Sequence, residues 1–269
     1  ITLSFAIAAL GCCFAGLCYA EFASMIPVAG SAYTYSYATM GELVAWIIGW
    51  DLVLEYCVAA TTVSISWSRY LVVFLEGFGV HLPQALTACP WDGGIVNIPA
   101  LMSILLIRGT EGSSIFNGII VFLKVSVVLV FVVLGWKYIR MENYTPYIPA
   151  NTGTLGEFGF SGILRGAAIV FFAFLGFDAV STAAQETKNP KRNMPIGILM
   201  SLVVCTILYM LFAHVMTGVV HYSAFAGQNG IAPVAIAIDH MGQMDASGVI
   251  RPDYPWMNRA IVIAILLGY

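Results

Sequence analysis

The feature that most constrains this chain is a series of long apolar segments with few charged residues. Seven such segments lie at approximately 1–26, 43–76, 94–108, 114–136, 161–187, 195–220 and 258–269. About 20 helical residues span the roughly 30 Å hydrocarbon core of a bilayer, and helices satisfy their own backbone hydrogen bonds there. We therefore predict an all-α polytopic membrane protein in which these segments are helices.

Composition excludes a water-soluble fold and several partner classes. Hydrophobic residues make up 60% of the chain and charged residues only 9%, whereas soluble domains carry about 25% charged residues. The net charge of −3, without a long basic segment, argues against a nucleic-acid partner. The six cysteines show neither disulfide-framework spacing nor a paired Cys-x-x-Cys metal motif. The bilayer is therefore the expected surrounding.

The lengths of the segments set expectations for the domain. The segment at 43–76 is long enough to tilt in the bilayer or emerge from it, whereas 94–108 is about five residues short of a comfortable span. The chain begins at Ile1 and stops at Tyr269 inside apolar segments. We expect a single transmembrane domain over 1–269, truncated at both ends.

Basic residues predict the orientation. Lys188, Lys191 and Arg192 lie in a loop of only about eight residues, and short basic loops stay on the cytoplasmic side. The loops on the other side, at 77–93 and 221–257, are longer. We predict a multi-pass protein of the cell membrane whose Lys188–Arg192 loop is cytoplasmic.

Ionisable residues within apolar segments are costly to insert and are functional candidates by default. They are Glu21, Asp51, Glu55, Arg69, Lys124, Asp178, Glu186 and His214. Asp51 and Glu55 are four residues apart and share one helical face. Such carboxylates could contact a cation or amine or accept a proton, or they could fix helix packing through hydrogen bonds.

Lys124 stands alone in the apolar stretch 119–133. Burial away from water disfavours the charged form of a lysine, so that the side chain could release a proton near neutral pH. The structural alternative is a permanently charged lysine neutralised by carbonyl groups or a carboxylate. Position alone favours the first interpretation.

The segment 161–187 carries Gly166, Gly176 and the sequence FFAFLGFD over 171–178. Glycine weakens a helix, and a membrane helix is broken only where its freed backbone groups line a cavity. The segment is therefore a candidate discontinuous helix. Close helix packing through small residues is the alternative.

One motif suggests an enzyme, an intramembrane serine hydrolase. The sequence GFSG at 159–162 places Ser161 in a Gly-x-Ser-Gly string, and His214 could be its base. In a chain this rich in glycine and serine such a string arises readily by chance, and Ser161 precedes its helix. The chain contains no phosphate loop, His-Glu-x-x-His motif or dinucleotide fingerprint. We predict no catalytic residues, no metal site and no enzyme.

Three stretches resemble one known family. They are YAEFASMIPVAGSAYTY at 19–35, GE at 41–42 followed by GWDLVLEY at 49–56, and FAFLGFDA at 172–179 followed by Glu186, NP at 189–190 and RNMP at 192–195. Together they resemble the amino acid/polyamine/organocation transporters, in particular the cationic amino acid transporter branch. The resemblance covers almost the whole chain.

The resemblance implies a fold and a set of site residues. The fold would be the leucine-transporter type with two inverted repeats, of which this chain holds helices two to the start of eight and lacks the first helix and the C-terminal helices. Main-chain carbonyls of Phe172, Ala173 and Leu175 would bind the substrate ammonium, and Phe171 and Phe174 would shape the pocket.

Two ionisable residues also receive roles from the resemblance. Glu55 would face the substrate cavity or the external gate. Lys124 matches a lysine that, in proton-coupled relatives, stands where sodium-coupled relatives bind a cation.

The implied function is a permease that imports an amino acid with a proton by alternating access. No cofactor is implied, and the proton rather than sodium is the coupling ion. An amino acid exchanger and a non-transporting amino acid sensor on the same fold are the alternatives. The sequence leaves open a cationic or a neutral substrate, and it leaves open the oligomeric state.

Overall fold

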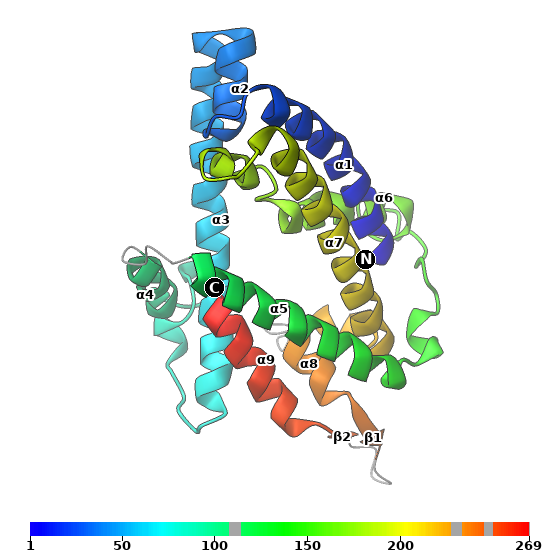
Figure 1. Ribbon diagram of the computed structural model, residues 1–269. Helices are drawn as coiled ribbons and strands as arrows, with labels where there is room; N and C mark the ends of the chain where they lie inside the picture. The colour runs from blue at the N-terminus through cyan, green and yellow to red at the C-terminus, as the bar shows by residue number, and fades with distance from the viewer. Residues whose placement is uncertain (108–113, 227–232, 245–249, 269) are drawn as a thin grey trace. The chain divides into compact units, whose positions relative to one another are not determined.

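The computed structural model describes residues 1–107, 114–226, 233–244 and 250–268 (Figure 1). Regular structure in these ranges is dominated by helices. The α-helices are α1 (Thr2–Met25), α2 (Ser31–Met40), α3 (Glu42–Glu76), α4 (Ile98–Ile107), α5 (Ser114–Gly135), α6 (Gly159–Val170), α7 (Pro190–Val219), α8 (Pro233–Asp239) and α9 (Pro255–Gly268). A short antiparallel pair of strands, β1 (Gly242–Met244) and β2 (Ile250–Pro252), lies between α8 and α9.

Five helical segments in the described ranges are long and apolar enough to cross a membrane. They are Thr2–Met25, Glu42–Glu76, Gly118–Tyr138, Gly159–Gln185 and Pro190–Val219. The prediction of an all-α polytopic membrane fold is confirmed. The two weakest predicted segments, 94–108 and 258–269, correspond to the short helices α4 and α9. Residue 108 lies outside the described residues.

The start of α4 differs from the predicted boundary for a clear reason. The helix begins at Ile98 rather than at residue 94 because Asn97 caps it: its side-chain Oδ1 accepts a hydrogen bond from the backbone N–H of Ala100 at 3.0 Å. An amide at this position satisfies an N–H that would otherwise have no helical partner. The preceding residues belong to the loop.

Prolines mark the starts of two further helices, which begin earlier than the apolar pattern of the sequence predicts. α7 begins at Pro190 rather than at residue 195, because proline is well suited to the first turn of a helix, where its missing N–H costs nothing. α9 begins at Pro255 rather than at 258. Pro27 follows α1, and the chain then turns through Gly30, whose φ is +136°, into the short helix α2. None of the seven apolar segments of the sequence predicts α2.

The chain divides into two compact units, each described here by itself. Unit 1 comprises Ile1–Glu55 and Thr145–His214, and unit 2 comprises Tyr56–Tyr144 and Val215–Tyr269. Helices α3 and α7 each contribute residues to both units.

In unit 1, α1 packs through a face of small residues. The buried positions recur at about every fourth residue and are Ser4, Ala8, Cys12, Gly16, Ala20 and Ala23. This spacing places them on one side of the helix, and small side chains allow helices in a bilayer to approach closely. α1 lies against α6 (Figure 1), where the Ser4 hydroxyl donates to the carbonyl of Ile163 at 3.1 Å. Gly16 faces Leu202 of α7.

In unit 2, α5 and α8 both pack against α9. The indole N–H of Trp67 on α3 donates to the carbonyl of Leu266 on α9 at 3.1 Å, and Tyr70, Ala235 and Val262 form a small buried cluster beside that bond. Apolar contacts and one polar tie therefore hold α9 to the C-terminal part of α3.

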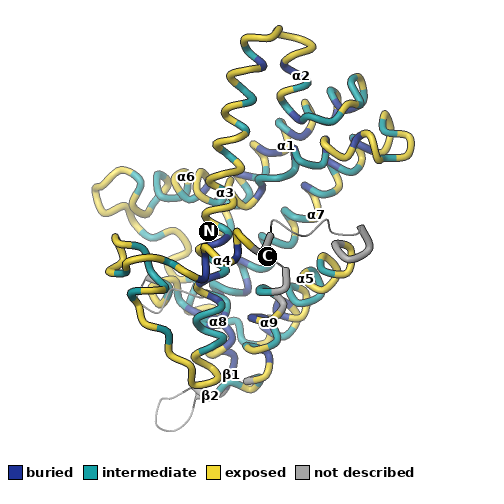
Figure 2. The backbone as a smooth tube through the Cα atoms, turned by 90° about the vertical axis from the view of Figure 1, so that its left-hand side faces the viewer, coloured by how far each residue is buried: buried dark blue, intermediate teal, exposed yellow. Residues whose placement is uncertain are grey.

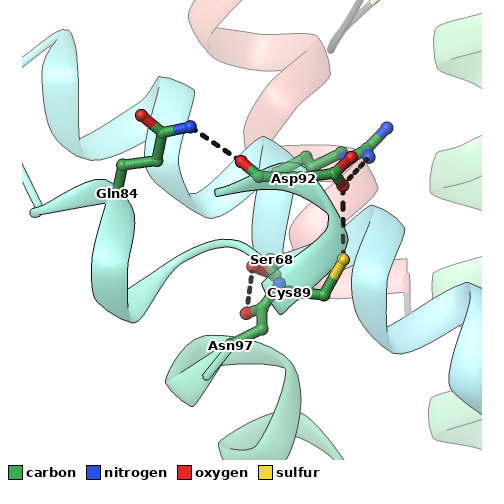
Figure 3. A network of polar contacts seen from close by, with 6 residues as sticks. Ser68, Gln84, Cys89, Asp92 and Asn97 are labelled. Atoms are coloured by element: carbon green, nitrogen blue, oxygen red, sulfur yellow. Dashed lines mark hydrogen bonds and ion pairs between the residues drawn. The ribbon is translucent and has the colours of Figure 1, made fainter. Parts of the chain in front are cut away.

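The loop between α3 and α4 is tied to α3 by polar contacts (Figure 3). The Ser68 hydroxyl donates to Asn97 Oδ1 at 2.6 Å, and Arg69 forms an ion pair with Asp92 at 3.7 Å. Asp92 also accepts from the Cys89 thiol through its carboxylate and from the Gln84 amide through its main-chain carbonyl. Exposed ion pairs contribute little by themselves, so the buried Ser68 bond is the firmer of the two ties to α3.

Much of the helical surface is exposed, and that surface is apolar. Figure 2 shows long exposed stretches on α3, where Trp46, Trp50 and Leu54 are all more than half exposed. A soluble monomer rarely exposes contiguous apolar surface on this scale. The exposure pattern fits helices that meet lipid or further transmembrane segments.

The contact between α1 and α6 gives a prediction for stability. A Cβ on Gly166 would lie 2.6 Å from the Ser4 hydroxyl, whereas a Cβ on Gly11 would meet none of the described atoms within 4 Å. Gly166→Ala in the full-length protein is expected to lower the free energy of unfolding by about 1–3 kcal/mol because the packed helices must separate. Gly11→Ala, the matched control, is expected to leave it unchanged or raise it.

Thermal unfolding of the detergent-solubilised protein, followed by tryptophan fluorescence, measures both variants. Equal midpoints for the two variants would contradict the close contact between α1 and α6.

Candidate functional site

The membrane segment that begins with α6 is discontinuous, as one of the two interpretations of its glycines predicts. α6 ends at Val170, a tight turn occupies Phe171–Phe174, and a second short helical stretch covers Ala179–Gln185. Between them Leu175 is extended, with φ −54° and ψ 137°, and Gly176 has a φ of +104°. Glycine adopts this conformation without steric cost. The other interpretation, close packing, holds for Gly166.

The break turns several main-chain carbonyls away from regular helical pairing. The Phe172 carbonyl accepts from the N–H of Leu175 at 3.2 Å, and the Phe174 carbonyl accepts from the N–H of Phe177 at 3.5 Å. The Ala173 carbonyl accepts from the Tyr209 hydroxyl of α7 at 2.9 Å. A carbonyl oxygen has two lone pairs, so each of these bonds leaves capacity for a second donor.

The aromatic side chains at the break fall into two environments. Phe171 is 41% exposed and Phe172 is 36% exposed, whereas Phe174 is 4% exposed. The Phe174 ring packs against Phe5 of α1 and Tyr209 of α7, with ring centroids 6.4 and 5.3 Å away. Phe174 is therefore a core residue of unit 1, whereas Phe171 and Phe172 each keep an exposed surface. The predicted pocket roles of Phe171 and Phe174 stay predictions.

A buried carboxylate, that of Asp178, follows the break; Asp178 is among the ionisable candidates in the sequence but received no role there. Asp178 is 5% exposed and accepts a hydrogen bond from the Ser31 hydroxyl at 3.0 Å. The main-chain carbonyl of Asp178 accepts from the fully buried Ser181 hydroxyl at 2.6 Å. Ser31 opens α2 with a φ of +50°. An acid two residues after Gly176 was the available signal, but its serine partner is 147 residues away.

Glu55 joins this cluster electrostatically. It is half-buried on α3 in unit 1, where its carboxyl group interacts with that of Asp178 and with the Tyr19 hydroxyl of α1. Asp51, one turn earlier, is exposed. The structure therefore brings Glu55, and not Asp51, toward the polar groups that follow the break. The role of Glu55 toward substrate or gate stays a prediction.

Lys124 lies in unit 2, near the middle of α5. Residues one helical turn before and after it, Val121 and Val128, are apolar, in agreement with its isolated position in the sequence. Its coupling role stays a prediction.

The structure assigns Ser161 a local role at the start of α6. Its hydroxyl accepts from the Asn151 amide at 2.9 Å and from the N–H of Gly156 at 3.1 Å, and it donates to the carbonyl of Phe158. These contacts hold the loop 151–158 against the first turn of the helix. The hydroxyl of a hydrolase nucleophile would instead bond to its general base.

Comparison with known proteins identifies relatives over the whole chain. A family model described as amino acid permease matches residues 1–268. The chain is 48% identical to the branched-chain amino acid permease BcaP of Bacillus subtilis, over all of this chain and 57% of that protein.

Two further relatives are named for other substrates. The chain is 44% identical to the methylthioribose transporter of Bacillus subtilis, over 93% of this chain and 53% of that protein. It is 36% identical to the chloroplastic cationic amino acid transporter 9 of Arabidopsis thaliana, over 93% of this chain and 44% of that protein. All three are named as permeases or transporters rather than enzymes. The chain spans about half the length of the curated relatives it matches.

The hydrogen bond between Ser31 and Asp178 gives a prediction that distinguishes a buried hydrogen bond from an exposed one. Ser31→Ala removes a donor to a buried carboxylate and is expected to lower the free energy of unfolding by about 1–3 kcal/mol. Ser24→Ala is the matched control, because the Ser24 hydroxyl donates only to the nearby carbonyl of Glu21 in an exposed setting. The control is expected to stay within about 0.5 kcal/mol of the parent.

Thermal unfolding of both full-length variants in detergent checks this expectation. A Ser31→Ala midpoint equal to that of Ser24→Ala would show that Asp178 does not depend on Ser31.

Proposed function

Because the chain belongs to the amino acid permease family, we propose that the whole protein carries an amino acid across the cell membrane by alternating access. The observation that carries the proposal is the discontinuous segment 159–185. In carriers of this type the substrate binds where a broken membrane helix presents backbone carbonyls near the midplane. The break at Phe171–Asp178 supplies such carbonyls in unit 1.

The proposed binding chemistry follows from those carbonyls. The ammonium group of the amino acid donates to the carbonyl oxygens of Phe172, Ala173 and Leu175, whose partial negative charges face a positive group. Phe171, which is exposed, covers the apolar part of the ligand. Glu55 and Asp178 place two carboxyl groups in the same unit.

The division of the chain into two compact units supports a rocking mechanism. Helices α1 and α6 and most of α7 belong to unit 1 with the break, and α4 and α5 belong to unit 2 with Lys124. Alternating access in this class moves one bundle of helices against another around a fixed site. We assign the moving bundle to α1, α6 and α7.

Proton coupling is assigned to Lys124. A lysine in an apolar helix releases its proton more readily than one in water, because the apolar surroundings disfavour the charged form. Protonation of Lys124 coupled to closure around the substrate would drive import by a proton gradient, with no sodium ion. Lys188, in the loop before α7, and Lys191 and Arg192, in the first turn of α7, lie on the cytoplasmic side in this proposal.

The relatives are named for different substrates, and these compounds make up the panel to be tested. Branched-chain and cationic amino acids and methylthioribose are therefore tested together. Methylthioribose carries no ammonium group, so its uptake would not use the carbonyl site in the proposed way.

Uptake of these radiolabelled compounds by the full-length protein in proteoliposomes tests the function directly. Gradient-stimulated uptake of one or a few amino acids is the expected result. Uptake that ignores the gradient but rises when the vesicles are preloaded with amino acid would identify an exchanger. Binding without uptake would identify a sensor.

Lys124→Ala is expected to abolish proton-driven accumulation while leaving exchange of labelled for unlabelled amino acid across the membrane, because exchange needs no net proton movement. Ser126→Ala is the matched control: it lies two residues away on α5, and its hydroxyl donates only locally, to the Phe122 carbonyl. Full gradient-driven uptake by Lys124→Ala would remove Lys124 from the coupling mechanism.

A further inference from the structure

The break in the segment 159–185 is held from outside by one side chain of α7. The Tyr209 hydroxyl donates to the main-chain carbonyl of Ala173 at 2.9 Å, across 36 residues of sequence. Ala173 is itself exposed within unit 1. This hydrogen bond therefore reaches the main chain of an exposed residue at the break.

Packing fixes the Tyr209 ring in the position that this bond requires. Its centroid lies 5.3 Å from that of Phe174 in an edge-to-face arrangement of 77°, and 5.7 Å from that of Phe5 on α1. Phe174 is almost fully buried. Aromatic pairs at these separations stabilise one another beyond simple burial, so the ring places its hydroxyl at the break with little freedom.

The turn at the break needs such external support. Tight turns of the kind at Phe171–Phe174 have poorer internal hydrogen-bond geometry than an α-helix, and the chain becomes extended immediately afterwards at Leu175. The carbonyl directions are thus set weakly by the turn alone. Tyr209 uses one lone pair of the Ala173 oxygen and leaves the other.

We propose that Tyr209 is a positioning residue for substrate binding: through its hydroxyl it aims the Ala173 carbonyl at the substrate ammonium. The inference rests on the proposed transport function and adds to it a residue on a different helix. Tyr209 does not itself touch the substrate in this assignment. Its loss changes how well the ammonium is bound, and not how much protein folds.

Tyr209→Phe in the full-length protein tests the assignment, because phenylalanine keeps the ring contacts and removes only the hydroxyl. A hydrogen bond of about 1 kcal/mol corresponds to roughly a fivefold change in affinity. The KM for amino acid uptake in proteoliposomes is expected to rise by about that factor, with the maximal rate within twofold of the parent. The unfolding midpoint without ligand stays unchanged, and the ligand-induced rise in that midpoint shrinks.

Tyr37→Phe is the matched control, since it makes the same chemical change on α2 at a side chain that is 54% exposed. It is expected to leave KM unchanged. A parental KM in Tyr209→Phe overturns the proposal, as does a fall in maximal rate and unfolding midpoint without a change in KM. A parent protein that transports no amino acid overturns the proposed function instead.

A pair of non-natural residues keeps the test valid if Tyr209→Phe folds poorly. 4-Aminophenylalanine and 4-methylphenylalanine at position 209 have nearly the same shape, but only the first retains an N–H donor. The amino variant is expected to have the lower KM of the two by several-fold. Equal KM values would overturn the role of the donor.

Discussion

Backbone hydrogen bonding in an apolar medium is the constraint on which this structure depends. The bilayer offers no water to an unpaired N–H or carbonyl group, so the chain crosses it as helices that satisfy themselves, such as α1, α3 and α7. The segment 159–185 departs from this rule at Phe171–Asp178. Neighbours in unit 1 meet the polar groups there: the Tyr209 hydroxyl of α7 donates to the freed main-chain carbonyl of Ala173, and the Ser31 hydroxyl of α2 donates to the side-chain carboxylate of Asp178.

Close packing of helices makes those neighbours available. Lipid is as apolar as a leucine side chain, so helices in a bilayer gain little from hiding apolar surface and associate through close fit instead. α1 accordingly presents serine, alanine, cysteine and glycine at its buried positions. Gly166 lets the α6 backbone approach Ser4 of α1. Phe5, the next residue on α1, then contacts the rings of Phe174 and Tyr209.

The parts of this structure that local sequence determines were predictable, and the parts that depend on distant contacts were not. Apolar length predicted the membrane helices, and Gly166 and Gly176 made the segment 161–187 a candidate for a break, with close helix packing as the alternative. The start of α4 was missed because it depends on the Asn97 cap rather than on apolarity. The environment of Asp178 was missed because Ser31 reaches it only after α1 and α2 have folded. Likewise, no local pattern separates Phe174, a core residue, from the exposed Phe171.

The side chain of Asn97 has a consequence for how α4 is placed. One oxygen atom accepts from both the Ser68 hydroxyl and the Ala100 N–H, so the same group begins α4 and ties it to α3. A shift of α4 by a single residue along α3 would carry Asn97 away from Ser68 and break the bond between the two helices, whereas the local bond to Ala100 would move with α4. The hydrogen bond from Ser68 of α3 therefore fixes the position of α4 along α3. α4 is too short to be positioned by its own length in the bilayer, and the side-chain amide of Asn97 positions it instead.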